Sequence, residues 1–161
     1  MEFLIAGLVA FLALMHLAYA IQNVLNPTQA GEAIADVLGQ AEAPVYPRSM
    51  MPPIRSRVSI WTALILIIAL QFAAGAALAL GAVQMFIAGG GSPADFAAAT
   101  EWALIGCGIA LLLWFGLFLT IGAALFQMWQ TPLGQGAMGD AYRNGTFAGV
   151  VMLILLFLPT V

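Results

Sequence analysis

Between Val58 and Ile87 the chain reads VSIWTALILIIALQFAAGAALALGAVQMFI, thirty residues without one charged side chain. A helix needs about 20 consecutive apolar residues to cross the hydrocarbon core of a bilayer. Strands of a membrane barrel would show shorter segments of alternating polarity, and this stretch shows none. Because lipid cannot satisfy unpaired backbone polar groups, the stretch is expected to be a transmembrane helix.

Three further apolar runs flank this one, at residues 3–21, 102–126 and 145–161. The first would span roughly 28 Å as a helix, close to the hydrocarbon thickness. It also resembles the core of a signal peptide, but no Lys or Arg precedes it, so we interpret it as a retained helix. The fourth is short, and its helix is expected to begin nearer Tyr142. The sequence therefore predicts an all-α, integral membrane four-helix bundle in one domain, residues 1–161.

The composition supports a membrane protein and excludes nucleic-acid binding. Hydrophobic residues make up 63% of the chain and charged residues 7%, whereas globular domains carry about 25% charged residues. The net charge is −3 and lysine is absent, so no basic face can displace the counterions of a nucleic acid. The single cysteine, Cys107, lies in an apolar run and is expected to be a buried hydrophobe.

The first loop is expected to contain a short amphipathic helix. Asn26 and Pro27 are typical of a helix start, and Gly39 of a helix end. Apolar residues recur at helical spacing between them, and the acidic residues fall on other faces. This helix would lie on the membrane surface or over the mouth of the bundle. The four arginines all lie in the first and third loops, which favours a cytoplasmic position for those loops.

Helices in lipid associate through close packing of small residues and through interhelical hydrogen bonds. Gln71 lies near the middle of its span and is expected to bond to another helix. Three rows of small residues, each at a spacing of four, are predicted as packing faces: Ala69, Ala73, Ala77 and Gly81; Gly116, Thr120 and Ala124; Gly145 and Gly149.

The spans contain no set of residues typical of catalysis. None of the seven acidic residues falls in the middle of a span, and no metal-ligand cluster or nucleophile–base pair can be assembled. We therefore predict that the protein is not an enzyme and needs no cofactor. His16 is the only histidine. It is interpreted as a packed hydrogen-bonding residue, with a single axial bond to a haem or pigment as the alternative.

Polar and aromatic residues gather at one predicted face of the bundle and could contact a lipid, another ligand or a partner: Tyr19, Gln127, Met128, Trp129, Gln130 and Arg143. Arg143 could bind a lipid phosphate or could anchor the fourth span at the interface.

Two segments carry a family resemblance. One is Leu17 to Leu38, with Asn23 and Val37-Leu38 as its anchors; the other runs from Leu112-Leu113-Trp114-Phe115 through Gly122 to Met128-Trp129-Gln130, then Gly136 and Ala141-Tyr142-Arg143. Together they resemble the bacterial small integral membrane proteins of the domain of unknown function 2165 family.

The resemblance implies four spans in the bacterial inner membrane and assigns no reaction. Relatives carry an acidic residue where this chain has Ala124, which puts any role of that carboxylate in doubt here. Relatives also carry basic residues at the N-terminus and second loop, which favours cytoplasmic termini, opposite to the arginine count. Both orientations stay open.

Two functions follow as hypotheses. The first is a non-catalytic accessory or structural subunit that binds other integral membrane subunits of a respiratory or photosynthetic complex. The second is a small membrane protein that binds or transports an apolar ligand such as a quinone or a lipid. A bound lipid, quinone or pigment is compatible with either.

Overall fold

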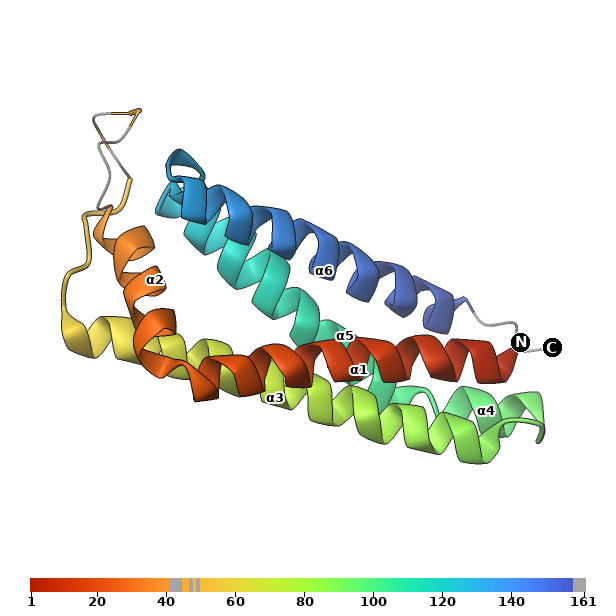
Figure 1. Ribbon diagram of the computed structural model, residues 1–161. Coiled ribbons are helices and arrows are strands. Elements are labelled where there is room, and N and C mark those ends of the chain that lie inside the picture. The colour runs from red at the N-terminus through yellow and green to blue at the C-terminus, as the bar shows by residue number, and fades with distance from the viewer. Residues whose placement is uncertain (41–44, 47, 49, 158–161) are drawn as a thin grey trace.

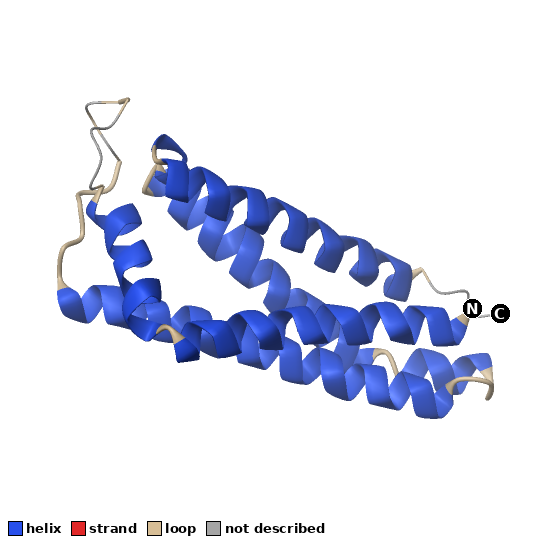
Figure 2. Cartoon of the chain, in the orientation of Figure 1, coloured by secondary structure: helices blue, strands red, loops and turns tan. Residues whose placement is uncertain are grey.

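The computed structural model describes residues 1–40, 45, 46, 48 and 50–157, and every regular element in these ranges is a helix (Figures 1 and 2). The all-α architecture predicted from the sequence is therefore confirmed. In chain order the elements are α1 (Glu2–Leu25), α2 (Pro27–Gly39), α3 (Arg57–Ala88), α4 (Pro93–Ala98), α5 (Glu101–Leu111), the π-helix η1 (Leu112–Leu125), the short 3-10 helix η2 (Met128–Gln130) and α6 (Pro132–Leu156).

Three helical stretches among the described residues are long and apolar enough to cross a membrane: Glu2–Leu25, Arg57–Ala88 and Pro93–Leu125. Large hydrophobic side chains point outward from each of them, including Phe11 at 73% exposure and Ile87 at 80%. Such surfaces are suited to lipid rather than water. α6 is not among the three, and its first half carries Asp140 and Arg143. Residues 158–161 of the predicted fourth span lie outside the described residues, so the count of four spans stays a prediction.

The start of α6 corrects the sequence prediction. The helix begins at Pro132, well before Tyr142, because Thr131 caps it: the Thr131 hydroxyl accepts a hydrogen bond of 2.9 Å from the Gly134 backbone N–H. The sequence prediction rested on apolar runs, so it missed the polar first half of α6. The amphipathic helix predicted in the first loop is present as α2, with the expected Pro27 start and Gly39 end.

The helices form two layers that diverge toward one end (Figure 1). α1 packs along α3, and α3 packs along α5, while α6 packs along α5 and η1. At the end where Met1 lies the layers are close together. At the opposite end η1 and α6 separate from α3, and α2 lies across this end.

Glycines set the close approach of α3 to its neighbours. A Cβ atom on Gly81 would lie 2.8 Å from the Ala103 Cα, and a Cβ atom on Gly106 would lie 2.8 Å from the Leu78 backbone nitrogen. The backbones of α3 and α5 therefore approach at these two points as closely as only glycine permits.

The predicted row on α3 follows the contact face only in part. Ala77 and Gly81 are buried, but Ala69 and Ala73 are exposed and do not pack within this chain. Residues four apart are offset by about 40° around an α-helix, so a long row with this spacing leaves the contact face.

The second predicted row does not lie at a helix contact, because η1 is wound as a π-helix. Thr120 and Ala124 are exposed, and a Cβ placed on Gly116 would have no described atom within 4 Å apart from its chain neighbours and the adjacent backbone of its own helix. In a π-helix the hydrogen bonds run to the fifth residue back, so faces assigned with an α-helical period are wrong. The Thr120 hydroxyl donates to the Phe115 carbonyl, 3.0 Å away and five residues back.

The row on α6 does lie at a helix contact. A Cβ atom on Gly145 would lie 3.5 Å from the Trp114 Cβ, and one on Gly149 would lie 3.9 Å from the Leu111 Cδ2. These are ordinary packing distances, so α6 meets α5 and η1 along this face.

Candidate functional site

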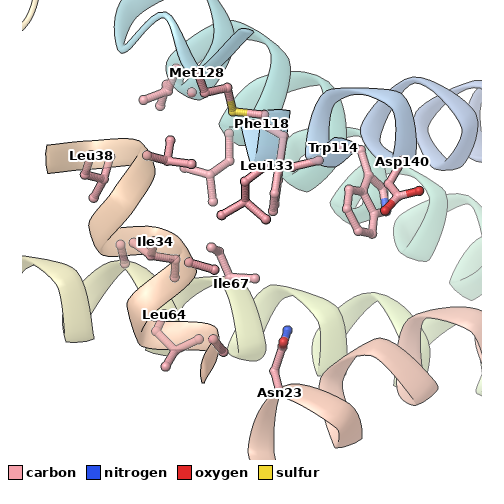
Figure 3. Close-up of a pocket in the computed structure, with 18 of the residues that line it drawn as sticks. Asn23, Ile34, Leu38, Leu64, Ile67, Trp114, Phe118, Met128, Leu133 and Asp140 are labelled. Carbon is pink, nitrogen blue, oxygen red and sulfur yellow. The ribbon is translucent and has the colours of Figure 1, made fainter. Parts of the chain in front are cut away.

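A cavity of about 280 Å³ lies where the two layers diverge, between α1, α2, α3, η1, η2 and α6 (Figure 3). Most of its walls are apolar. Side chains labelled in Figure 3 approach it from α2 (Ile34 and Leu38), α3 (Leu64 and Ile67), η1 (Phe118) and α6 (Leu133). Its polar or ionisable lining residues are Tyr19, Asn23, Gln71, Trp114 and Asp140.

The amphipathic helix α2 forms one wall of this cavity, as expected for a helix over the bundle mouth. Its apolar face supplies Ile34, Val37 and Leu38 to the lining. The end of the helix is fixed to the chain that leads into α3, because the Leu38 carbonyl accepts a hydrogen bond of 2.8 Å from the Ile54 N–H. Gln40 donates to the Met51 carbonyl at 3.1 Å beside it.

Two amides meet at the wall formed by α1 and α3. The Asn23 amide nitrogen donates to the Gln71 Oε1 at 3.0 Å, which is an interhelical hydrogen bond of the kind expected for Gln71. Gln71 is only 2% exposed. Its own amide nitrogen makes no hydrogen bond with any described residue, although the side chain lines the cavity. The cavity therefore has an unpaired amide donor in a mostly apolar surrounding.

His16 fixes the orientation of Trp114. An indole nitrogen can only donate, so the 2.9 Å contact between Trp114 Nε1 and His16 Nε2 makes Nε2 the acceptor. The proton is therefore on Nδ1, which donates to the Leu12 carbonyl at 2.8 Å. Both ring nitrogens of His16 are occupied, and the residue is fully buried. This arrangement leaves no nitrogen for an axial bond unless the Trp114 contact breaks.

Trp114 is the centre of an aromatic wall that consists of Tyr19, Trp114 and Phe118. The Tyr19 ring meets Trp114 edge-on with centroids 5.5 Å apart, and the Phe118 ring lies 5.2 Å from Trp114. All three residues line the cavity. The edge-on Tyr19–Trp114 pair has a favourable geometry for aromatic contacts, and the hydrogen bond to His16 holds the central ring.

The six residues predicted as a ligand or partner face have separate positions. Tyr19 and Met128 line the cavity. Trp129 and Gln130 instead contact the first loop: the Gln130 Oε1 accepts from the Tyr46 backbone N–H at 2.9 Å, and the Trp129 ring meets Tyr46 with centroids 5.2 Å apart. Gln127, at φ 55°, accepts from the Gln130 side chain at 2.6 Å.

Arg143 does not face the cavity. It forms an ion pair with Asp140, one helical turn earlier, and its side chain is 66% exposed. Asp140 lines the cavity and is 45% exposed, so it lies at the rim.

The described part of the chain contains no group of three or more His, Cys, Asp or Glu side chains that could hold a metal ion. Sequence reasoning missed Asn23 as the partner of Gln71, and it missed Asn144. The Asn144 amide nitrogen is buried without a hydrogen-bond partner among the described residues.

A family comparison agrees with the apolar helices that this site belongs to an integral membrane protein. The sequence profile of the domain of unknown function 2165 family, described as a predicted small integral membrane protein, matches residues 1–159. Comparison with curated proteins and with solved structures gives no match. The match covers nearly the whole chain, and the protein belongs to the domain of unknown function 2165 family of small integral membrane proteins.

Proposed function

We propose that this protein binds an apolar molecule of the membrane in the cavity between α2, α3 and η1, without catalysing a reaction on it. The observation that supports this proposal is the cavity itself, about 280 Å³ with a mostly apolar lining and a few polar groups. Ligand sites in proteins are typically concave and apolar with few placed polar groups, and they begin at about 300 Å³. The bacterial inner membrane is the proposed location.

The cavity has an apolar route to lipid. Ile121 on η1 and Leu133 on α6 both line it, and they are 41% and 47% exposed. A molecule dissolved in the bilayer could pass between these side chains without crossing a charged surface. This apolar route suits molecules dissolved in lipid and not water-soluble compounds, so it favours a hydrophobic ligand.

The test is a pair of alanine substitutions on α3. Ala63 lines the cavity, whereas Ala69 lies six residues further along the same helix and is exposed. Ala63→Phe fills the cavity, and Ala69→Phe adds the same ring to the outer surface. The protein is purified in mild detergent, extracted with organic solvent, and its bound molecules are identified by mass spectrometry.

The expected result is one molecule enriched with the unaltered protein and with Ala69→Phe, and reduced at least tenfold with Ala63→Phe. Equal recovery from both variants would show that the bound molecules coat the surface and would overturn the proposal. Thermal unfolding of both variants in the same detergent checks that each is folded.

A second candidate function is that of an accessory subunit that packs against other integral membrane proteins. It is favoured by the small exposed residues of α3, since Ala69, Ala73 and Ala76 all face outward. Small residues let helix backbones approach in lipid. Isolation in a gentle detergent should then give stoichiometric partner subunits, and Ala73→Leu should release them. A lone species with no partner in either sample would contradict this second function.

A further inference from the structure

We infer that the ligand is a lipid-soluble quinone, whose ring lies against the aromatic wall and whose carbonyl accepts a hydrogen bond from Gln71. This inference rests on the proposed function, because it assigns a chemical class to the molecule in the same cavity. Four features of the cavity carry it: its size, the unpaired amide donor of Gln71, the lack of a Lys or Arg among its described lining residues, and its aromatic wall.

The size fits a ring system and not a whole lipid. A protein cavity of about 150 Å³ accommodates benzene, and this one measures about 280 Å³. The space is enough for one or two fused rings with small substituents. A long tail must therefore leave through the apolar opening at Ile121 and Leu133, which suits the tail of a membrane quinone.

The polar group of the ligand is an acceptor. Gln71 is 2% exposed, its carbonyl oxygen is bonded to Asn23, and its amide nitrogen has no partner among the described residues. The Gln71 nitrogen is not among the fully buried unpaired atoms of the described residues, so it can be reached from the cavity, and a ligand that supplies a carbonyl oxygen gains a hydrogen bond there. If the oxygen and nitrogen positions of both side-chain amides were exchanged, Gln71 would donate to Asn23, and the Asn23 amide nitrogen would be the free donor at the same wall.

The charge at the cavity disfavours anionic lipids. No Lys or Arg is among the described residues that line it, and the carboxyl at its rim, Asp140, is already paired with Arg143, so this lining offers no free cation to a carboxylate or phosphate. The nearest cation in sequence, Arg143, is paired with Asp140 and largely exposed. A neutral carbonyl compound satisfies Gln71 without bringing a second negative charge to the rim.

The aromatic wall supplies a flat surface for the ring. Tyr19 and Phe118 each pack against Trp114, and Trp114 is held by its hydrogen bond to His16. A wall fixed before binding loses little conformational freedom when a ring stacks on it. A fatty chain has no flat face that can stack on these rings, so the aromatic wall favours a ligand that contains a ring.

The experiment uses Trp114 as the reporter. The other three tryptophans, Trp61, Trp102 and Trp129, are replaced by Phe, and the protein in detergent is titrated with three probes. Decylubiquinone has a ring carbonyl and a tail; decylbenzene has the ring and tail without a carbonyl; decanoate has the tail with a carboxylate. Binding is followed by the Trp114 fluorescence and by displacement of decylubiquinone.

Decylubiquinone is expected to quench Trp114 with a saturable curve, and decylbenzene is expected to bind at least tenfold more weakly. Decanoate should not displace the quinone. Gln71→Leu keeps the volume of the side chain but removes the amide, so it should weaken decylubiquinone binding about tenfold and leave decylbenzene unchanged. Gln84→Leu is the matched control, because Gln84 lies on the same helix and is not among the cavity residues.

Equal binding of decylubiquinone and decylbenzene to the protein with Gln71 intact would overturn the inference, and this comparison does not depend on whether Gln71→Leu folds. The cavity would still bind apolar molecules in that case. The proposed function fails separately, if Ala63→Phe leaves both the extracted molecules and the binding of every probe unchanged.

Discussion

The two halves of the bundle differ in how closely their helices approach. In the closed half, around Gly81 and Gly106, the backbones of α3 and α5 touch with no room for a Cβ atom. In the open half, around Gln71 and Trp114, α3 and η1 are separated by a cavity of about 280 Å³. The same helix, α3, takes part in both.

The difference follows from the side chains at each level. Glycine and alanine on α3 and α5 allow close packing in lipid, where no hydrophobic effect drives helices together. Further along, bulky residues face inward from η1, and the change from α-helical to π-helical winding begins at Leu112, just before Trp114. π-helical segments occur frequently at functional sites.

The largest expected effect comes from Gly81→Ala in the closed half. The added Cβ would lie 2.8 Å from the Ala103 Cα, so the two backbones must move apart. Because backbone atoms rather than a flexible side chain must move, we expect a loss of unfolding free energy of about 3 kcal/mol or more, measured by thermal unfolding in detergent. Gly108→Ala is the control on α5, since nothing lies within 4 Å of a Cβ there. Equal unfolding temperatures for both variants would show that the backbones of α3 and α5 are not in close contact at Gly81.

A smaller effect is expected from His16→Leu, at the boundary between the halves. The variant leaves the buried Trp114 indole N–H without its acceptor, which costs about 1–3 kcal/mol at most. The Trp114 emission should also shift as the ring loses its fixed orientation. Gln22→Leu, an exposed change on α1, should alter neither property. A visible absorption band that disappears with His16→Leu would contradict this structural role and favour a pigment ligand.

Apolar run length predicted most of the fold. The run at residues 58–87 nearly coincides with α3, and the Asn26-Pro27 and Gly39 signals delimit α2. The row Ala69–Ala73 on α3 and the row Gly116–Ala124 on η1 were misplaced, for two reasons. A spacing of four drifts around an α-helix, and nothing in the apolar composition of η1 marks its change of winding.

The candidate site was predictable only as single residues. His16 and Gln71 are conspicuous because each is a polar residue in an apolar run. Their partners are not, because Trp114 lies 98 residues from His16 and Asn23 lies 48 residues from Gln71 in the chain. Gln130 was assigned to a ligand face, but its oxygen accepts the Tyr46 N–H, 84 residues away. Such pairings depend on how the helices cross, which residue periodicity does not encode.

The smallest effect is expected from Arg143→Gln at the rim of the open half. An exposed ion pair contributes about 0–1 kcal/mol, and Arg143 and Asp140 are 66% and 45% exposed. The unfolding temperature in detergent should therefore change little, and that change should vanish at high salt as the pair is screened. Decylubiquinone affinity should also be unaffected, because Arg143 does not line the cavity. Weaker binding of Arg143→Gln to vesicles containing anionic lipid, compared with neutral vesicles, would instead show that this side chain binds a lipid phosphate.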